Sequence, residues 1–215
     1  MSHTSALPLV LDPATGARHG LRAVLGTAAW ERLPEAVRER FAEAAGAADY
    51  AGSFEVVRAS FIGRLFAWMG TLVGTPVAPR TGLDVEARVR VRPNAAGMEW
   101  VREYFWGADA IDRVHSTKVV TADNRLIEML PARLCMPLAT YVEGAVLHFV
   151  SLGYYFDLGL GVKLRLPGLL TPGVTHVEHI DLGRGWFRFT MTVTHPLLGE
   201  MFFQTGRFCA TEEAA

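Results

Sequence analysis

The sequence predicts a mainly β protein, an antiparallel β-barrel or strongly curved half-barrel with two N-terminal helices packed against it. Over residues 84–92, charged and aliphatic side chains alternate without interruption, which is typical of a strand with one wet and one dry face. Residues 186–193 repeat this pattern with aromatic and aliphatic side chains on one face. Ten such segments without helices between them favour a sheet that curls around its own interior, because a flat sheet would leave long exposed edges.

The first helix is predicted over residues 27–45. Apolar residues from Trp30 to Phe41 recur at three- and four-residue spacing. Pro34 lies near the start of this stretch, where its missing amide costs little. Residues 1–26, which are punctuated by proline and glycine, are expected to form an N-terminal arm before a single β-rich domain of residues 27–215.

A second helical stripe runs from Ile62 to Val73 and is ended by Gly74 and Pro76. This helix is apolar enough to be mostly covered. We therefore expect it to plug one end of a barrel or to pack across an open sheet.

The strands then follow one another, separated by turn-forming segments such as residues 94–97 and 183–185. A short strand over residues 54–60 is expected between the two helices. The ten later strands are predicted over residues 83–92, 98–106, 112–121, 125–130, 138–143, 145–157, 161–166, 174–182, 185–194 and 200–209.

Composition excludes several function classes. The 215 residues are 50% hydrophobic, enough for a substantial core in one domain. Twenty-one basic and 22 acidic residues leave a formal net charge of −1, so no basic field exists to hold a nucleic acid and we expect no such partner. Cys135 and Cys209 are too far apart in sequence to resemble a metal pair, and two lone thiols fit a reducing cytoplasm.

No segment is predicted to span a membrane. The longest apolar candidate, residues 61–73, contains Arg64 and is shorter than the roughly 18 residues that a span requires. Residues 1–15 lack the continuous apolar centre of a signal peptide because Pro8 and Asp12 interrupt them. We expect a soluble, cytoplasmic protein.

One predicted strand carries an arginine among three aromatic rings on a single face. The residues on that face are Trp100, Arg102, Tyr104 and Trp106. Such an arginine is expensive to bury unless it meets a carboxylate or a ligand anion. Glu128 and Glu178 interrupt apolar strands, so an internal ion pair that holds the sheet in register is one interpretation. The other is a polar anchor in an aromatic pocket that orients the head group of an apolar ligand.

The run from His176 to His179 has the composition of a metal motif. On a strand, only His176 and Glu178 point to the same side, and His179 points to the other. A zinc site needs further ligands. We therefore interpret the run as a solvated strand face and expect no metal.

His148 lies on a predicted strand whose two faces are both largely apolar, which indicates a central strand and at least partial burial. If desolvation dominates, its pKa falls and the imidazole could serve as a neutral general base. The alternative is a core histidine that is hydrogen-bonded to a hydroxyl or a carbonyl.

Two other chemistries are excluded by pattern. His115 and Ser116 are adjacent and point to opposite faces, and the chain has no Gly-x-Ser-x-Gly segment, so serine-hydrolase chemistry is disfavoured. No glycine-rich phosphate loop follows a strand and opens a helix. We expect no cofactor.

Short motifs in a fixed order cover roughly residues 30–208. They are Leu33-Pro34, Val37-Arg38, Gly63-Arg64-Leu65, Trp100-x-Arg102, Ser116, Leu126-x-Glu128, Leu166-Pro167, Pro172-Gly173, Gly185-x-Phe187-x-Phe189 and Pro196-Leu197-x-Gly199. Their order and spacing resemble the bacterial family called "domain of unknown function 4166". The resemblance implies a shared β-rich fold and brings no established activity. Some members carry this domain behind a saccharopine-dehydrogenase-like oxidoreductase domain, and we expect this chain to be the stand-alone form.

The leading functional hypothesis is a barrel cavity, lined by aromatic residues, that binds a small, mostly apolar molecule. A cofactor-independent cyclase, isomerase or hydrolase of a hydrophobic metabolite is the alternative, with His148 or Glu128 as the catalytic acid or base. A structural or partner domain of an oxidoreductase is the third hypothesis. The expected ligand-binding residues are Trp100, Arg102, Tyr104, Trp106 and Tyr154.

Overall fold

The structure is a computed structural model that describes residues 20–42, 46–71, 80–107 and 110–211. Its strands are β1 (Ala48–Ala59), β2 (Gly82–Pro93), β3 (Met98–Phe105), β4 (Ile111–Val120), β5 (Leu126–Met129), β6 (Leu134–Glu143), β7 (Val146–Ser151), β8 (Tyr155–Gly159), β9 (Val162–Arg165), β10 (Val174–Gly183), β11 (Trp186–His195) and β12 (Gly199–Ala210). All pairings between them are antiparallel.

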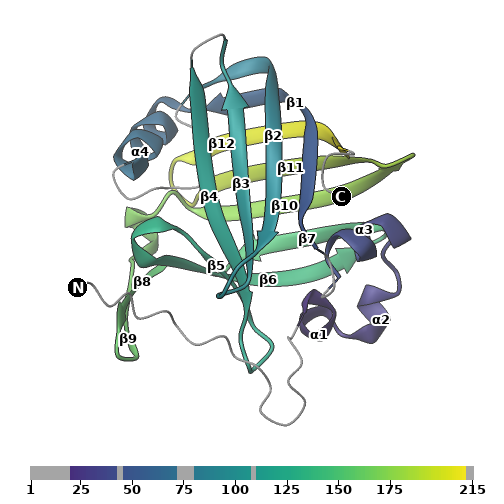
Figure 1. Cartoon of the computed structure of the whole chain (residues 1–215). Coiled ribbons are helices and arrows are strands. Elements are labelled where there is room, and N and C mark those ends of the chain that lie inside the picture. Colours follow the sequence, from purple (N-terminus) through teal and green to yellow (C-terminus); the bar gives the residue numbers. More distant parts are fainter. Residues whose placement is uncertain (1–19, 43–45, 72–79, 108–109, 212–215) are drawn as a thin grey trace, which may run out of the picture.

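Ten of these strands close into a barrel within the described part of the chain (Figure 1). Their order around the ring is β5-β4-β3-β2-β1-β12-β11-β10-β7-β6. The ring closes because β5 pairs with β4 on one side and with β6 on the other. The β8–β9 hairpin extends from the start of β6 and lies outside the ring. The predicted antiparallel barrel with N-terminal helices is confirmed.

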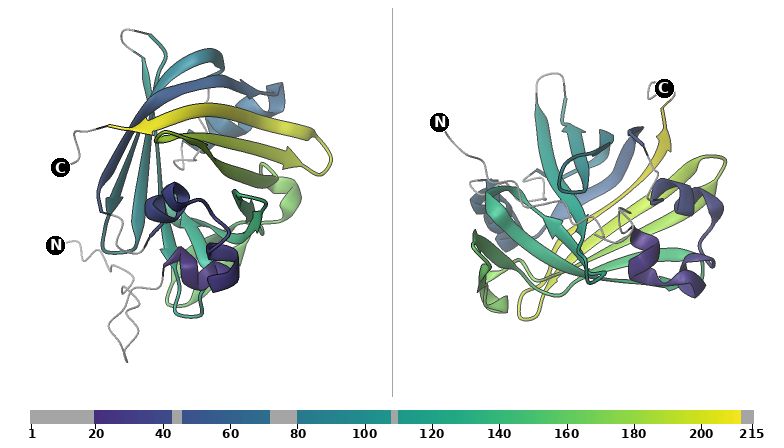
Figure 2. Two further views of the ribbon diagram at one scale, coloured as in Figure 1. Left: turned by 90° about the vertical axis from the view of Figure 1, so that its right-hand side faces the viewer. Right: turned by 60° about the horizontal axis from the view of Figure 1, so that its bottom comes forward.

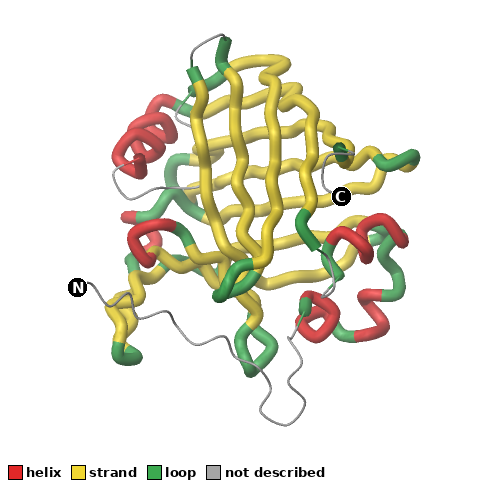
Figure 3. Tube along the Cα trace, viewed as in Figure 1, coloured by secondary structure: helices red, strands yellow, loops and turns green. Residues whose placement is uncertain are grey.

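Helices lie at both ends of the barrel (Figures 1 and 3). The short helices α1 (Leu21–Leu25), α2 (Thr27–Trp30) and α3 (Glu35–Arg40) pack together at one end. The helix α4 (Phe61–Thr71) lies at the opposite end, and the two further views in Figure 2 agree with this arrangement. None of the helices in the described residues has the length and apolar character to cross a membrane.

The end of the barrel below α3 is filled by aromatic packing. Phe41, which directly follows α3, places its ring centroid 5.7 Å from those of Trp100 and Phe149. The same ring meets the buried imidazole of His179 edge-on at 5.0 Å. These contacts close this end of the interior.

The other end is covered by α4, which approaches β12 very closely. A Cβ atom at Gly63 would collide with the backbone carbonyl of Met201. Glycine therefore permits the helix to lie directly on the strand. The side chains of Phe66 and Ala67 on α4 turn towards the barrel interior.

The first helix differs from its prediction over residues 27–45. The chain ends α2 at Trp30 and begins α3 at Glu35, because Pro34 has no amide to donate and holds an extended ψ of 148°. Within the predicted arm, the described residues 20–26 contain α1, and Leu21 is buried. Residues 1–19, 43–45 and 72–79, which hold the rest of the arm and two predicted helix ends, lie outside the described residues.

The strands follow their predicted ranges with three differences. The strand predicted over residues 138–143 begins earlier, at Leu134. The strand predicted over residues 145–157 is interrupted after Ser151, where Gly153 adopts a φ of 118° that favours glycine. This break allows β8 to leave β7 and to pair with the start of β6. The short strand predicted over residues 54–60 begins earlier, at Ala48, and β1 has 12 residues.

Candidate functional site

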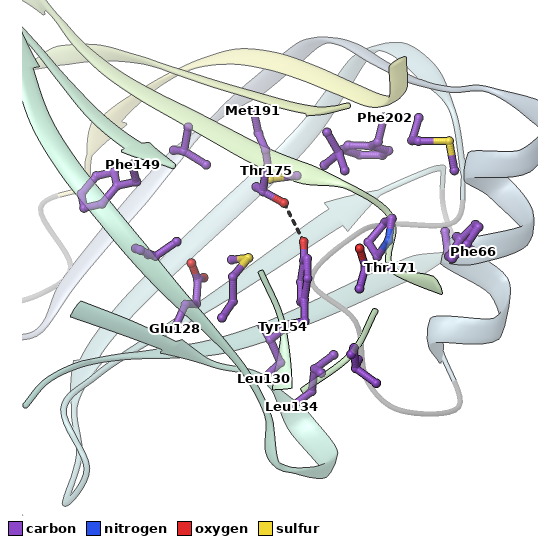
Figure 4. A pocket seen from close by; sticks show the side chains of 18 of the residues that line it. Phe66, Glu128, Leu130, Leu134, Phe149, Tyr154, Thr171, Thr175, Met191 and Phe202 are labelled. Atoms are coloured by element: carbon purple, nitrogen blue, oxygen red, sulfur yellow. Dashed lines mark hydrogen bonds between the residues drawn. The ribbon is translucent and has the colours of Figure 1, made fainter. Parts of the chain in front are cut away.

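A cavity of about 300 Å³ lies inside the barrel on the side of α4. Most of the side chains that line it are aliphatic or aromatic. They come from β6, β7, β8, β10, β11, β12 and α4, and from segments that connect the strands. Figure 4 shows Glu128 and Phe149 at one end of this cavity and Phe66 and Thr171 at the other. Three charged residues also line it, and all three come from the β3–β4–β5 wall.

Two of the charged residues form an ion pair. Lys118 on β4 and Glu128 on β5 are direct partners in the strand register, with Lys118 Nζ 3.3 Å from Glu128 Oε1. Their side chains are only 13% and 8% exposed. Because β4 and β5 alternate in and out, this register brings both charged groups to the interior face.

The third charged residue is Arg102 on β3, which is 8% exposed. Its guanidinium carbon lies 5.7 Å from the centroid of Phe189. Among the described residues, no carboxylate oxygen lies within 4.0 Å of its nitrogen atoms. Arg102 is therefore a buried cation that faces the cavity and has no ion-pair partner in the part of the chain that the structure describes.

The three charges influence one another strongly. Burial opposes the ionisation of Glu128. The charges of Lys118 and Arg102, together with hydrogen bonding by Ser116 and Lys118, outweigh it and hold the pKa of this carboxyl below its usual 4.5. Burial lowers the pKa of Lys118, and Glu128 offsets this effect only in part. When all three groups are ionised they carry one net positive charge, which an anionic group of a bound molecule would neutralise.

The neutral polar side chains that line the cavity are hydrogen-bonded to other groups of the protein. The hydroxyl oxygen of Tyr154 lies 2.9 Å from Thr175 Oγ1, drawn as the dashed line in Figure 4. The backbone N–H of Thr175 donates to Ser151 Oγ at 2.8 Å. Tyr154, one of the predicted ligand-binding residues, thus lines the cavity with its hydroxyl already hydrogen-bonded.

The other predicted aromatic residues, Trp100, Tyr104 and Trp106, do not line this cavity. Tyr104 is fully buried and stacks on Phe54 and on Trp106, with centroid distances of 4.9 and 6.1 Å. Its hydroxyl donates to Gln204 Oε1 at 3.0 Å. These rings fill the core, and Arg102 alone of that strand face reaches the cavity.

The predicted catalytic residues His148 and Glu128 lie on opposite sides of the barrel wall. Phe149 lines the cavity, so its neighbour His148 points outwards. There, His148 Nδ1 lies 3.0 Å from His176 Nε2 and 3.6 Å from Glu178 Oε1. Burial lowers the pKa of His148, and the nearby Glu178 carboxylate offsets part of this shift. The two catalytic candidates therefore do not converge on one cavity.

Lys118 is the site residue that the sequence reasoning missed. It shares a strand face with Ser116, opposite to the face of His115, and this alternation was visible in the sequence. The missing information was the register between β4 and β5, which places Lys118 opposite Glu128. Glu128, one of the two predicted ion-pair partners of Arg102, therefore pairs with Lys118 instead.

A family model described as "Domain of unknown function (DUF4166)" matches residues 33–208. No curated protein and no solved structure matches the chain. The matched region begins just before α3 and ends within β12, so it contains all but the last two residues of the barrel and the helix that covers the cavity.

Proposed function

The chain belongs to the family described as "Domain of unknown function (DUF4166)", and we propose that its barrel binds a small, mostly apolar molecule that carries one anionic group. The observation that carries this proposal is the charge of the cavity: two cations, Arg102 and Lys118, against one carboxylate, Glu128. A carboxylate is the simplest group that would complete this set, because it can accept hydrogen bonds from a guanidinium in two places at once.

The size of the cavity supports a small ligand. About 300 Å³ lies at the lower end of the range for ligand pockets and fits a metabolite rather than a polymer. The largely apolar wall would take up the body of such a molecule, and burying that surface supplies most of the binding free energy.

The distribution of the polar groups supports one orientation. The positively charged Nζ of Lys118 lies 5.8 Å from the ring centroid of Phe149, at the end of the cavity away from α4. The opposite end is formed by Phe66 and by residues that follow the short 3₁₀ helix Gly168–Leu170. The anionic head would therefore lie beside Lys118 and Arg102, with the apolar body directed towards α4.

The test compares acids with their own esters. A series of small aliphatic and arylalkyl carboxylates, each paired with its neutral methyl ester, is titrated into the protein by calorimetry. We expect at least one acid to bind about tenfold tighter than its ester, equivalent to about 1.4 kcal/mol. Arg102→Met should remove this preference and retain the weaker binding of the ester.

The matched control is Arg58→Met, which removes an exposed arginine that pairs with Glu200 outside the cavity. This variant should keep the preference for the acid. Equal binding of acids and esters to the wild-type protein would contradict the anionic head group, and failure of both series to bind would contradict the proposed function as a whole.

A further inference from the structure

A second cluster of ionisable groups lies on the outside of the barrel, at β7 and β10. It consists of His148, His176 and Glu178, and one potential ligand atom from each residue lies within 4.8 Å of the other two. This cluster is separate from the cavity, because the inward-facing residues of the same strands, Phe149 and Val177, line the cavity on the other side of the wall.

The strand register builds this cluster. His148 on β7 is directly opposite Glu178 on β10, and His176 lies two residues further along the same face of β10. Both strands are internal to the ring, with β6 and β11 on their other sides. The three side chains are therefore held on a rigid surface rather than on loops, which favours a defined coordination geometry.

The ring of His148 is fixed from two further directions. Its imidazole is 5% exposed and stacks on Tyr141 of β6 with a centroid distance of 4.6 Å and an interplanar angle of 7°. On its other side it stacks on His176 at 5.2 Å. Its Nδ1 atom faces both remaining members of the cluster.

Two of the three separations in the cluster are close to those between ligands of one metal ion. Four-coordinate zinc with bonds of about 2.0–2.1 Å places its ligand atoms about 3.3 Å apart. The separations of 3.0 Å between His148 Nδ1 and His176 Nε2, and of 3.6 Å between His148 Nδ1 and Glu178 Oε1, lie on either side of this value. Only small side-chain adjustments would admit an ion.

We propose that His148, His176 and Glu178 bind one divalent transition-metal ion on the outer face of the barrel. Two imidazoles and a carboxylate suit zinc and the neighbouring divalent ions rather than magnesium or calcium, which prefer oxygen ligands. Three protein ligands leave at least one position open to water or to a small anion, as in metal sites that carry chemistry. Because Glu178 is 32% exposed, this open position is accessible from solvent.

The test measures metal binding to the full chain after any histidine tag has been removed and the protein has been stripped with a chelator. Zn²⁺ binding is followed by calorimetry, and Co²⁺ is used as a coloured probe of the ligand set. We expect one ion per chain, with a melting temperature that rises with Zn²⁺ concentration. His176→Ala and Glu178→Gln should each weaken binding by roughly tenfold or more.

The control is His115→Ala, which removes the histidine of another outer His–Glu pair, 3.9 Å from Glu99. Within the described residues, no second histidine joins this pair. This variant should bind Zn²⁺ as the wild type does. His176 and Glu178 are partly exposed, so both variants are expected to melt close to the metal-free wild type. Absence of stoichiometric binding, or binding that survives both substitutions, would overturn the proposal. Neither outcome depends on whether the cavity binds a ligand.

Discussion

At the scale of single residues, Arg102 is a cavity-lining charge with no carboxylate within ion-pair distance among the described residues. It is buried, and among the described residues the cavity's one carboxylate is paired with Lys118. We predict that Arg102→Met changes the free energy of unfolding of the ligand-free protein by less than about 1.5 kcal/mol, since the swap roughly conserves volume. Urea denaturation measures this difference directly.

A much larger loss would have a different meaning. Removing one member of an internal buried ion pair costs about 3–5 kcal/mol, because the partner charge is left buried. If Arg102→Met has that effect in the ligand-free protein, Arg102 is a member of an internal ion pair and does not belong to the ligand site.

Glu128 is expected to behave in the opposite way. Glu128→Gln leaves Lys118 and Arg102 without a counter-charge in a buried wall, so we predict a loss of about 3–5 kcal/mol in urea denaturation. The control is Glu200→Gln, which breaks the exposed pair with Arg58 and should cost no more than about 1 kcal/mol. Equal costs for the two variants would show that burial of the Lys118–Glu128 pair has no energetic consequence.

The lowered pKa of Glu128 also predicts a dependence of stability on pH. A carboxyl whose folded pKa lies below its unfolded value of 4.5 contributes stability above that value and loses it as the pH falls through the folded pKa. We expect wild-type stability to fall below pH 4.5 more steeply than that of Glu128→Gln. Denaturation curves at a series of acidic pH values test this, and parallel profiles would contradict the assignment.

At the scale of elements, the contact between α4 and β12 is the most tightly constrained. Alanine is a better helix former than glycine by about 1 kcal/mol, which alone would make Gly63→Ala stabilising. The added Cβ collides with the Met201 carbonyl, however, so we predict a net loss of about 1–3 kcal/mol. Gly46→Ala, where a Cβ meets nothing within 4 Å, is the control. A more stable Gly63→Ala variant would contradict this close contact.

The strands could be predicted from the sequence because alternation is a local property. β2 and β11 show it over nearly their whole length, and both appear where the pattern indicated. Breaks within long apolar runs are less visible. The interruption at Gly153 depends on β8 pairing with β6, which is a tertiary contact that no local pattern encodes.

The candidate site could be predicted only in part, and the reason is register. Alternation assigns a residue to a face, and it does not say which residue of another strand lies opposite. It therefore gave the inward direction of Arg102 but neither the pairing of Lys118 with Glu128 nor that of His148 with Glu178. It also grouped Tyr104 with Arg102, although Tyr104 lies deeper along the same face, against Phe54.

At the scale of the whole molecule, a single sheet separates two chemical environments. Along β7 and β10, inward residues face an apolar cavity and outward residues form the histidine cluster. The strands of this wall are internal to the ring, and each has a partner on both sides. The barrel therefore supports both proposed sites with backbone that is hydrogen-bonded throughout, which limits movement of either site relative to the other.

The weakest part of the ring is β5, which closes it. This strand has four residues, against twelve in β1 and in β12, and it carries Glu128. Because local opening follows the elements with the fewest contacts, we predict that its amide hydrogens exchange faster than those of β1 and β12. The fully exposed β9, which lies outside the ring, should exchange faster still.

A ligand that contacts the β3–β4–β5 wall should selectively slow this exchange. Binding to the closed barrel opposes every opening that would separate Glu128 from Lys118. The protection of β5 should therefore rise, while that of β1, which does not line the cavity, stays unchanged. Hydrogen exchange followed by mass spectrometry, with and without a bound carboxylate, measures both segments in one experiment. If the amide hydrogens of β5 exchange as slowly as those of β1 in the free protein, β5 is not the weakest strand of the ring. Equal protection of β5 and β1 by the ligand would contradict a selective effect on this wall of the cavity.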